Sequence, residues 1–136
     1  TLYIKILYVN YELGYAVIEI LGEWNDCLYN DIMYLKRNII VLLNEQGINK
    51  YILIGENILN FHASDDSYYQ EWFEDNEEGW IIGINFRQHV IDEFQLARID
   101  YYISPGGHLN ELNWRTLTPM QLFEVINRYM SKLLSA

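Results

Sequence analysis

Short runs of apolar and aromatic residues alternate with helical patterns along the chain. Residues 2–9 and 15–22 are rich in β-branched and aromatic side chains, and the short turn between them predicts an antiparallel hairpin. Residues 51–55 form a nearly all-apolar run, which is typical of a central strand covered on both faces. Two further strands are predicted, over residues 80–86 and 99–103.

Helical periodicity separates these runs. Apolar residues recur at helical spacing over residues 28–44. Three more helices are predicted, over residues 68–75, 87–97 and 119–134. Thr118, Pro119 and Gln121 form the clearest helix start, because the threonine and glutamine can exchange capping hydrogen bonds around a proline in the first helical position. Residues 108–117 are compatible with a loop or with a short extra strand.

The order of these elements predicts one α/β domain over residues 1–136. Helices between successive strands imply a mixed, mostly parallel sheet of about five strands with about four helices, to which the N-terminal hairpin adds an antiparallel edge. The polar residues 23–26 are expected to end the second strand, and residues 56–64 are expected to form a loop.

Charge is concentrated in one part of the chain. The net charge of −10 argues against nucleic acid or an anionic membrane as a partner, since both reward clustered Lys and Arg. Residues 51–86 contain no Lys or Arg and carry eight acidic residues: Glu56, Asp65, Asp66, Glu71, Glu74, Asp75, Glu77 and Glu78. Four aromatic residues are interleaved with them: Tyr68, Tyr69, Trp72 and Phe73. This pattern predicts an amphipathic helix with an acidic outward face.

Other features narrow the class of protein. No apolar run approaches the roughly 20 residues that a membrane span needs. Cys27 is the only cysteine, so no internal disulfide is expected and a reducing cytoplasm is the simplest location. The phosphate-binding and dinucleotide-binding glycine motifs and the serine nucleophile elbow are absent from the sequence, and no cofactor is expected.

The order of elements in residues 3–55 resembles the first half of a STAS domain, the fold of anti-sigma-factor antagonists. In that family a G-x-x-D turn follows the second strand, and Gly22 and Asp26 stand near that place here. Residues 81–103 are similar to the family's later strand–helix–strand segment. The resemblance implies a STAS-like fold and a non-catalytic regulatory role.

STAS regulators carry an Asp-Ser-x-Gly-like turn at the start of the helix after the central strand, and a partner kinase phosphorylates the serine. Asp66-Ser67 stands near that place, without the glycine. A phosphate on Ser67 would be favoured by the helix N-terminus and repelled by Asp65 and Asp66. The alternative is that Ser67 only caps the helix, with Gln70 completing a capping box.

An enzyme or small-ligand-binding protein is the alternative function, because ligands in such sheets bind beyond the carboxyl ends of the strands. The residues near its pocket would be His62, Asp65, Asp66, Gly106 and Gly107. A histidine beside two carboxylates suits a metal site, and His89 or His108 would supply a further ligand. The H-x-x-x-H and H-E-x-x-H motifs that place two metal-binding histidines on one helix are absent from the sequence. Cys27 suits either a nucleophile paired with a histidine or a small packed residue.

The sequence as a whole predicts a regulatory or protein-interaction module. The expected partner or regulatory surface comprises His62, Asp65, Asp66, Ser67, Tyr68, Tyr69 and Trp72. Its partner is expected to be another protein, or a second copy paired at the hairpin edge to give a homodimer. Tyrosine and tryptophan favour such a role because they bury large areas in protein interfaces.

Overall fold

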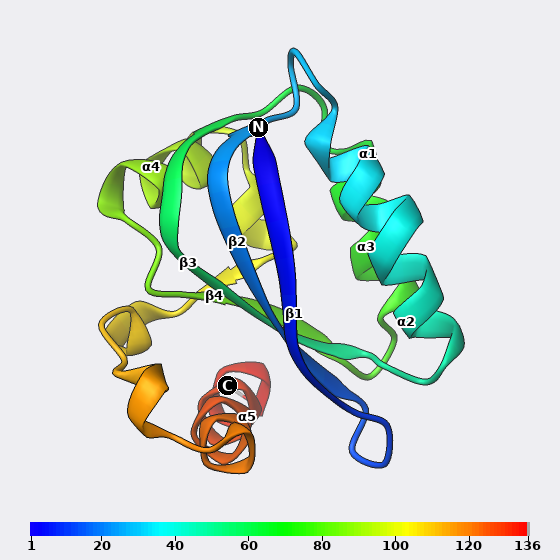
Figure 1. Cartoon of the computed structure of the whole chain (residues 1–136), viewed down its shortest axis with the longest axis vertical. Coiled ribbons are helices and arrows are strands. Elements are labelled where there is room, and N and C mark those ends of the chain that lie inside the picture. Colours follow the sequence, from blue (N-terminus) through cyan, green and yellow to red (C-terminus); the bar gives the residue numbers. More distant parts are fainter. Residues whose placement is uncertain (136) are drawn as a thin grey trace.

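The structure is a computed structural model, and residues 1–135 are described (Figure 1). Five strands form one sheet in the order β1-β2-β3-β4-β5. The first pair is antiparallel and the other three pairs are parallel. The strands are β1 (Leu2–Asn10), β2 (Tyr15–Asn25), β3 (Lys50–His62), β4 (Trp80–Ile84) and β5 (Ser104–Pro105).

The first helical segment has a π-helical middle. It consists of α1 (Asp31–Leu35), the π-turn η1 (Lys36–Ile40) and α2 (Val41–Glu45). The other α-helices are α3 (Ser67–Asp75), α4 (Gln88–Leu96) and α5 (Pro119–Ser135). Three 3-10 turns complete the fold: η2 (Ile99–Tyr101), η3 (Gly107–Leu109) and η4 (Trp114–Thr116).

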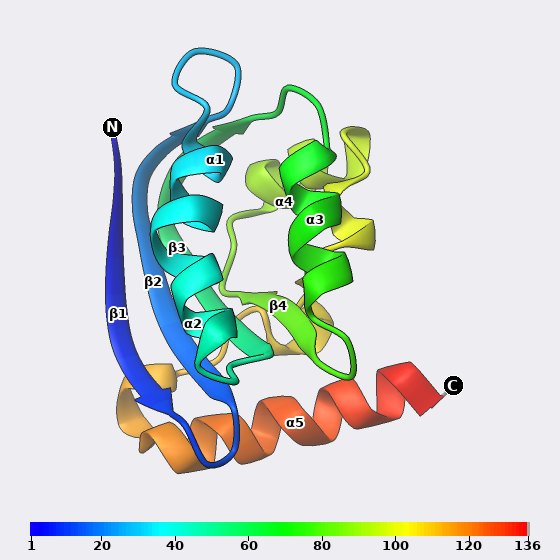
Figure 2. The same cartoon turned by 90° about the vertical axis from the view of Figure 1, so that its right-hand side faces the viewer.

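Each face of the sheet carries its own core. Alternate residues of β2, such as Ile18 and Val17, point to opposite faces, so the run is apolar throughout. The α1–α2 segment, α3 and α4 cover one face, and α5 covers the other (Figure 2). The predicted mixed α/β architecture, with its N-terminal hairpin and mostly parallel sheet, is confirmed.

Two strands are longer than predicted. β2 continues through Glu23 to Asn25, and β3 runs on to His62. The parallel ladder pairs Leu21 with Asn57 and Asn25 with His62, so the polar end of each strand is hydrogen-bonded to the other. The loop expected at residues 56–64 is therefore mostly strand, because backbone pairing prevails over side-chain polarity here.

The prediction of a strand at residues 99–103 is wrong. These residues form η2 and the turn after it, in which the N–H groups of Tyr102 and Ile103 both donate to the Ile99 carbonyl at 2.9 Å. The fifth strand is only Ser104–Pro105. Of the two alternatives for residues 108–117, the structure has the loop, which contains the end of η3 and the whole of η4.

The two predicted capping boxes have different outcomes. Thr118 and Gln121 make both reciprocal bonds, at 2.9 and 3.1 Å, as predicted. Ser67 is the first helical residue of α3, and its hydroxyl donates to Asp65 instead of capping the helix. The Gln70 side-chain amide donates to Glu74 at 2.9 Å, so the predicted capping box between Ser67 and Gln70 does not form.

Candidate functional site

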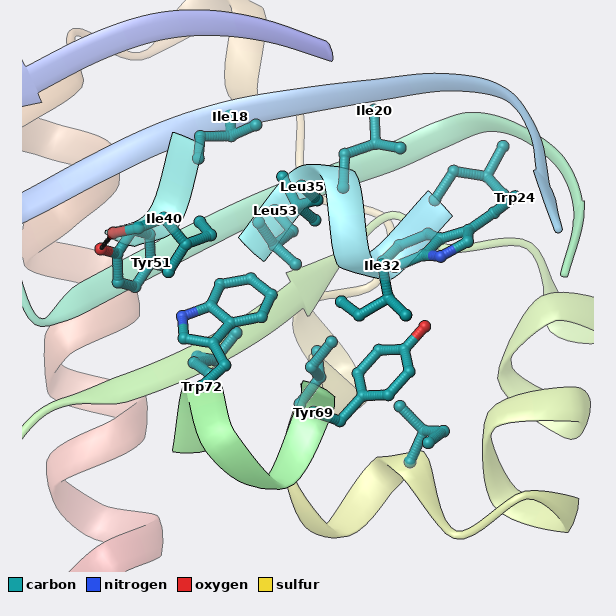
Figure 3. Packing of buried hydrophobic residues seen from close by; sticks show 14 of the residues in the cluster. Ile18, Ile20, Trp24, Ile32, Leu35, Ile40, Tyr51, Leu53, Tyr69 and Trp72 are labelled. Carbon is teal, nitrogen blue, oxygen red and sulfur yellow. Dashed lines mark hydrogen bonds between the residues drawn. The ribbon is translucent and has the colours of Figure 1, made fainter. Parts of the chain in front are cut away.

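Two of the residues predicted to form a partner surface lie in the core. Tyr69 and Trp72 are fully buried and point from α3 toward the α1–α2 segment and the sheet (Figure 3). The ring of Trp72 meets Tyr51 edge-on with centroids 5.3 Å apart, and Tyr69 packs 6.3 Å from Trp24. Both side chains therefore anchor α3 to the domain, and neither contributes to a surface.

A buried carboxylate fixes the position of Tyr69. Asp26 accepts hydrogen bonds from the Tyr69 hydroxyl at 2.5 Å, from Trp24 Nε1 at 3.1 Å and from the Ile32 backbone N–H at 2.9 Å. Burial raises the pKa of Asp26 above its ordinary value even though these bonds lower it. Burial and the adjacent carboxylate both raise the pKa of Tyr69. The contact joins α3 to the end of β2.

The exposed aromatic residues beside α3 come from two segments. Phe73 lies on the outer side of α3, with 44% of its surface exposed. Its ring centroid is 5.5 Å from that of Tyr101 and 5.7 Å from that of Tyr102. Tyr101 is 70% exposed, and its ring meets Tyr102 edge-on at 5.2 Å. The three rings therefore form one cluster at the surface.

Carboxylates border this cluster. The Tyr102 hydroxyl donates to Asp66 Oδ2 at 2.7 Å, and this hydrogen bond raises the pKa of Tyr102. Glu74 also contributes to that increase through its charge. We call Phe73, Tyr101 and Tyr102, together with Asp66 and Glu74, the acidic-aromatic face. The prediction missed both tyrosines because residues 99–103 have the composition of a strand.

The acidic segment is partly neutralised by bases distant in sequence. Lys36, fully buried at its side chain, pairs with Glu71 at 3.2 Å and with Asp75 at 2.8 Å. Glu56 pairs with Arg115 at 2.5 Å, which lowers its pKa against the effect of burial. The carboxylates that remain outside these ion pairs are Asp65, Asp66, Glu74, Glu77 and Glu78.

Ser67 is exposed at the start of α3. Its hydroxyl and its backbone N–H both donate to the carboxylate of Asp65. These bonds hold the pKa of Asp65 below its ordinary value. Tyr68 is half-buried, with the Arg37 guanidinium 5.4 Å from its ring centroid. Ser67 therefore presents an accessible hydroxyl at this end of α3.

Within residues 1–135, the histidines and Cys27 each lie in a different local environment. His62 is exposed at the end of β3, and His89 donates from Nε2 to the Leu59 carbonyl at 2.6 Å. His108 stacks edge-on against Tyr129 of α5. The Cys27 thiol, which is exposed, donates to the Ala63 carbonyl at 2.8 Å. Within residues 1–135 no group of three His, Cys, Asp or Glu side chains is arranged to hold a metal ion.

This arrangement of sheet and helices occurs in known proteins. The unphosphorylated form of SpoIIAA, an anti-sigma factor antagonist, superposes with a TM-score of 0.60 and 13% identity, over 95% of this chain and 97% of that one. The chain has the fold of SpoIIAA. The phosphorylated form of SpoIIAA, a Bacillus cell fate determinant, gives a TM-score of 0.53 at 13% identity, over 93% and 99% of the two chains. The STAS-like fold inferred from element order is thus confirmed.

The likeness to SpoIIAA concerns the fold. No family model matches the sequence, and no curated protein matches it significantly. Among the described residues, no helix combines the length and apolar character needed to cross a membrane.

Proposed function

We propose that this chain is a non-catalytic regulatory module of the cytoplasm that binds a protein partner through the acidic-aromatic face. The surface cluster of exposed Phe73 and Tyr101 with half-buried Tyr102 is the observation that supports this function. Aromatic side chains anchor protein interfaces because they bury a large area with few rotatable bonds. The carboxylates of Asp66 and Glu74 suit a partner whose apolar contact surface is bordered by Lys or Arg.

The SpoIIAA fold supports a regulatory role. SpoIIAA is an anti-sigma factor antagonist, and it exists in unphosphorylated and phosphorylated forms. By analogy, Ser67 is the proposed site of modification here, since its hydroxyl is exposed at the start of α3 and Asp66 belongs to the proposed interface. A phosphate there would add negative charge beside Asp65 and Asp66 and would change the affinity for a basic partner.

Site-specific photo-crosslinking tests the interface. A photo-reactive phenylalanine replaces Tyr101, and in a matched control it replaces Tyr11, a tyrosine of similar exposure in the β1–β2 hairpin. The proposal predicts a discrete crosslinked protein from position 101 that is absent from position 11. Binding of that purified protein should then weaken in F73A and Y101A and be retained in Y11A. Equal crosslinking at both positions, or unchanged affinity in Y101A, would overturn the interface.

Mass spectrometry tests the modification separately. The protein is incubated with kinases encoded beside its gene, and S67A serves as the control. A phosphorylated peptide containing Ser67 in the wild type, together with its loss in S67A, is the expected result. Absence of any modified Ser67 peptide would remove this part of the proposal and leave the interface test unaffected.

We also propose self-association at the β1 edge. This nine-residue edge strand exposes Tyr3, Ile6 and Leu7, and it contains no acidic residue. In a chain of net charge −10, such a segment is where two copies approach with the least repulsion. Light scattering should give a dimer for the wild type, a monomer for I6K, and a dimer for the control L96K on α4. A monomeric wild type at high micromolar concentration would refute it.

A further inference from the structure

A small pocket lies on the opposite face of the sheet from the acidic-aromatic face. It is formed between α5, the long helix at the bottom of Figure 2, and the turn η3. Its volume is about 190 Å³, and its lining residues are His108, Leu109, Val125, Arg128, Tyr129 and Lys132. Pockets for drug-sized ligands measure roughly 300–1,000 Å³, so this one suits a smaller ligand.

The pocket is basic although the chain is strongly acidic. Arg128 and Lys132 stand one helical turn apart, at a spacing that places both side chains on the same side of α5. Within residues 1–135, neither makes an ion pair, whereas Lys36 and Arg115 are paired with carboxylates. Both side chains are exposed. An anion bound between them would offset the repulsion between two like charges four residues apart on one helix.

The η3 turn places the His108 ring beside Tyr129 of α5. The His108 ring meets the Tyr129 ring at 75° with centroids 5.2 Å apart. Gly107 has a φ of 56°, and a Cβ atom there would lie only 2.9 Å from the Tyr129 hydroxyl oxygen. The positive φ and this close contact both favour glycine where the turn approaches α5. Gly107 thus lets η3 approach a pocket whose side chains include an imidazole and a phenol, both potential donors.

We propose that this α5 pocket binds a small phosphate-type anion, either free phosphate or the phosphate group of a monoester. The guanidinium of Arg128 offers two parallel donors to an oxyanion, and the ammonium of Lys132 adds a compact positive charge. The Tyr129 hydroxyl and the His108 ring supply directional bonds at the side of the pocket. The site uses no residue of the acidic-aromatic face and goes beyond the function proposed above.

Titration of ¹⁵N-labelled protein with inorganic phosphate at low ionic strength, followed by NMR, tests the site. The expected result is saturable shifts at His108, Arg128, Tyr129 and Lys132 that sodium chloride does not reproduce. In R128Q/K132Q the affinity should fall by about tenfold or more, because charge-assisted hydrogen bonds are lost. The matched control K5Q/R98Q removes two exposed bases that do not line the pocket and should bind as the wild type does.

Three results with phosphate would overturn the proposal. They are the absence of saturable shifts, undiminished binding in R128Q/K132Q, and an equal loss in K5Q/R98Q, which would indicate general screening of the charge. Acetate serves as an anion of another class, and binding of acetate as tight as that of phosphate would also overturn the assignment. Phenyl phosphate distinguishes the two sources: tighter binding than inorganic phosphate indicates a monoester, and weaker or equal binding indicates free phosphate.

Discussion

The ammonium nitrogen of Lys36 lies 2.8 Å from the carboxylate of Asp75, which follows it by 39 residues in the chain. Glu71, one turn earlier on α3, accepts a second bond from the same ammonium at 3.2 Å. The lysine side chain is fully buried, while the two carboxylates are about half exposed. The acidic helix is therefore tied to the π-turn η1 by a single cation that lacks contact with solvent.

The first prediction follows from this difference in burial between Lys36 and its two carboxylate partners. Replacing both acids, in E71Q/D75N, leaves a buried ammonium without a counter-charge and should cost about 3 kcal/mol of unfolding free energy. K36M keeps most of the side-chain volume and leaves two carboxylates that water can reach, so its cost should be smaller, about 1 kcal/mol. Urea denaturation of both variants measures the two costs. A larger loss in K36M than in E71Q/D75N would contradict this account.

The second prediction concerns the pH dependence of stability. Because burial raises the pKa of Asp26 in the folded protein, its contribution to stability is full below its ordinary value of 3.8 and is lost as pH rises through the raised value. The unfolding free energy of the wild type minus that of D26N should therefore fall as pH rises through this window and then level off. Tyr69, whose pKa this carboxylate also raises, stays protonated throughout this window. If this free-energy difference rose with pH instead, the raised pKa of Asp26 would be contradicted.

Removal of the hydroxyl that faces this carboxylate gives a third prediction. Y69F keeps the ring among its aromatic neighbours and leaves one buried oxygen of Asp26 without its 2.5 Å partner. The expected loss is about 1–3 kcal/mol of unfolding free energy. Y101F, which also removes a tyrosine hydroxyl but at an exposed position, should change stability by less than about 0.5 kcal/mol. Equal effects of the two substitutions would argue against the buried contact.

The fourth prediction tests the start of α5. T118A removes the hydroxyl that accepts a bond from the Gln121 N–H and should cost about 1 kcal/mol. T116A serves as the control, since the Thr116 hydroxyl bonds only to a carbonyl of its own turn. Thermal unfolding of the two variants compares them, and the account fails if T116A is the more damaging change.

A fifth prediction contrasts two glycines. A Cβ atom on Gly79 would lie 1.7 Å from the Asn49 carbonyl oxygen, so G79A forces two backbone segments apart and should cost more than about 2 kcal/mol. Gly47 has a φ of 90°, and a Cβ atom there would meet no atom of residues 1–135 within 4 Å, so G47A should cost only the conformational strain, about 1 kcal/mol. Denaturant melts of both variants would contradict the packing argument if G47A were the less stable.

Much of the fold is predictable because it rests on local patterns. The apolar run at residues 51–55 and the Thr118–Gln121 cap both depend on neighbours in sequence, and both are found as predicted. The ends of β2 and β3 are not predictable in this way. Their polar residues pair with each other across the sheet, and this pairing depends on a register between segments far apart in the chain.

The candidate surface shows the same division. The sequence placed aromatic residues and acids on one helix, but it did not distinguish buried Tyr69 and Trp72 from exposed Phe73. Tyr101 and Tyr102 join Phe73 only because η2 folds back beside α3. Residues 51–86 contain no Lys or Arg, but this does not leave their acids unpaired. Lys36 and Arg115, which lie outside the segment in sequence, pair with Asp75 and Glu56 in the folded chain.

The two sides of the sheet differ in how they can grow. β5 has two residues, and one of them is Pro105, which has no N–H to offer. Beyond Ile54, where β4 ends its pairing with β3, the carbonyls of Glu56 and Leu59 accept bonds from the side chains of Arg87 and His89. Strand addition is thereby left to β1. If two chains join there about a two-fold axis, each uses its open edge, so growth stops at a closed pair and no fibre can propagate through the sheet.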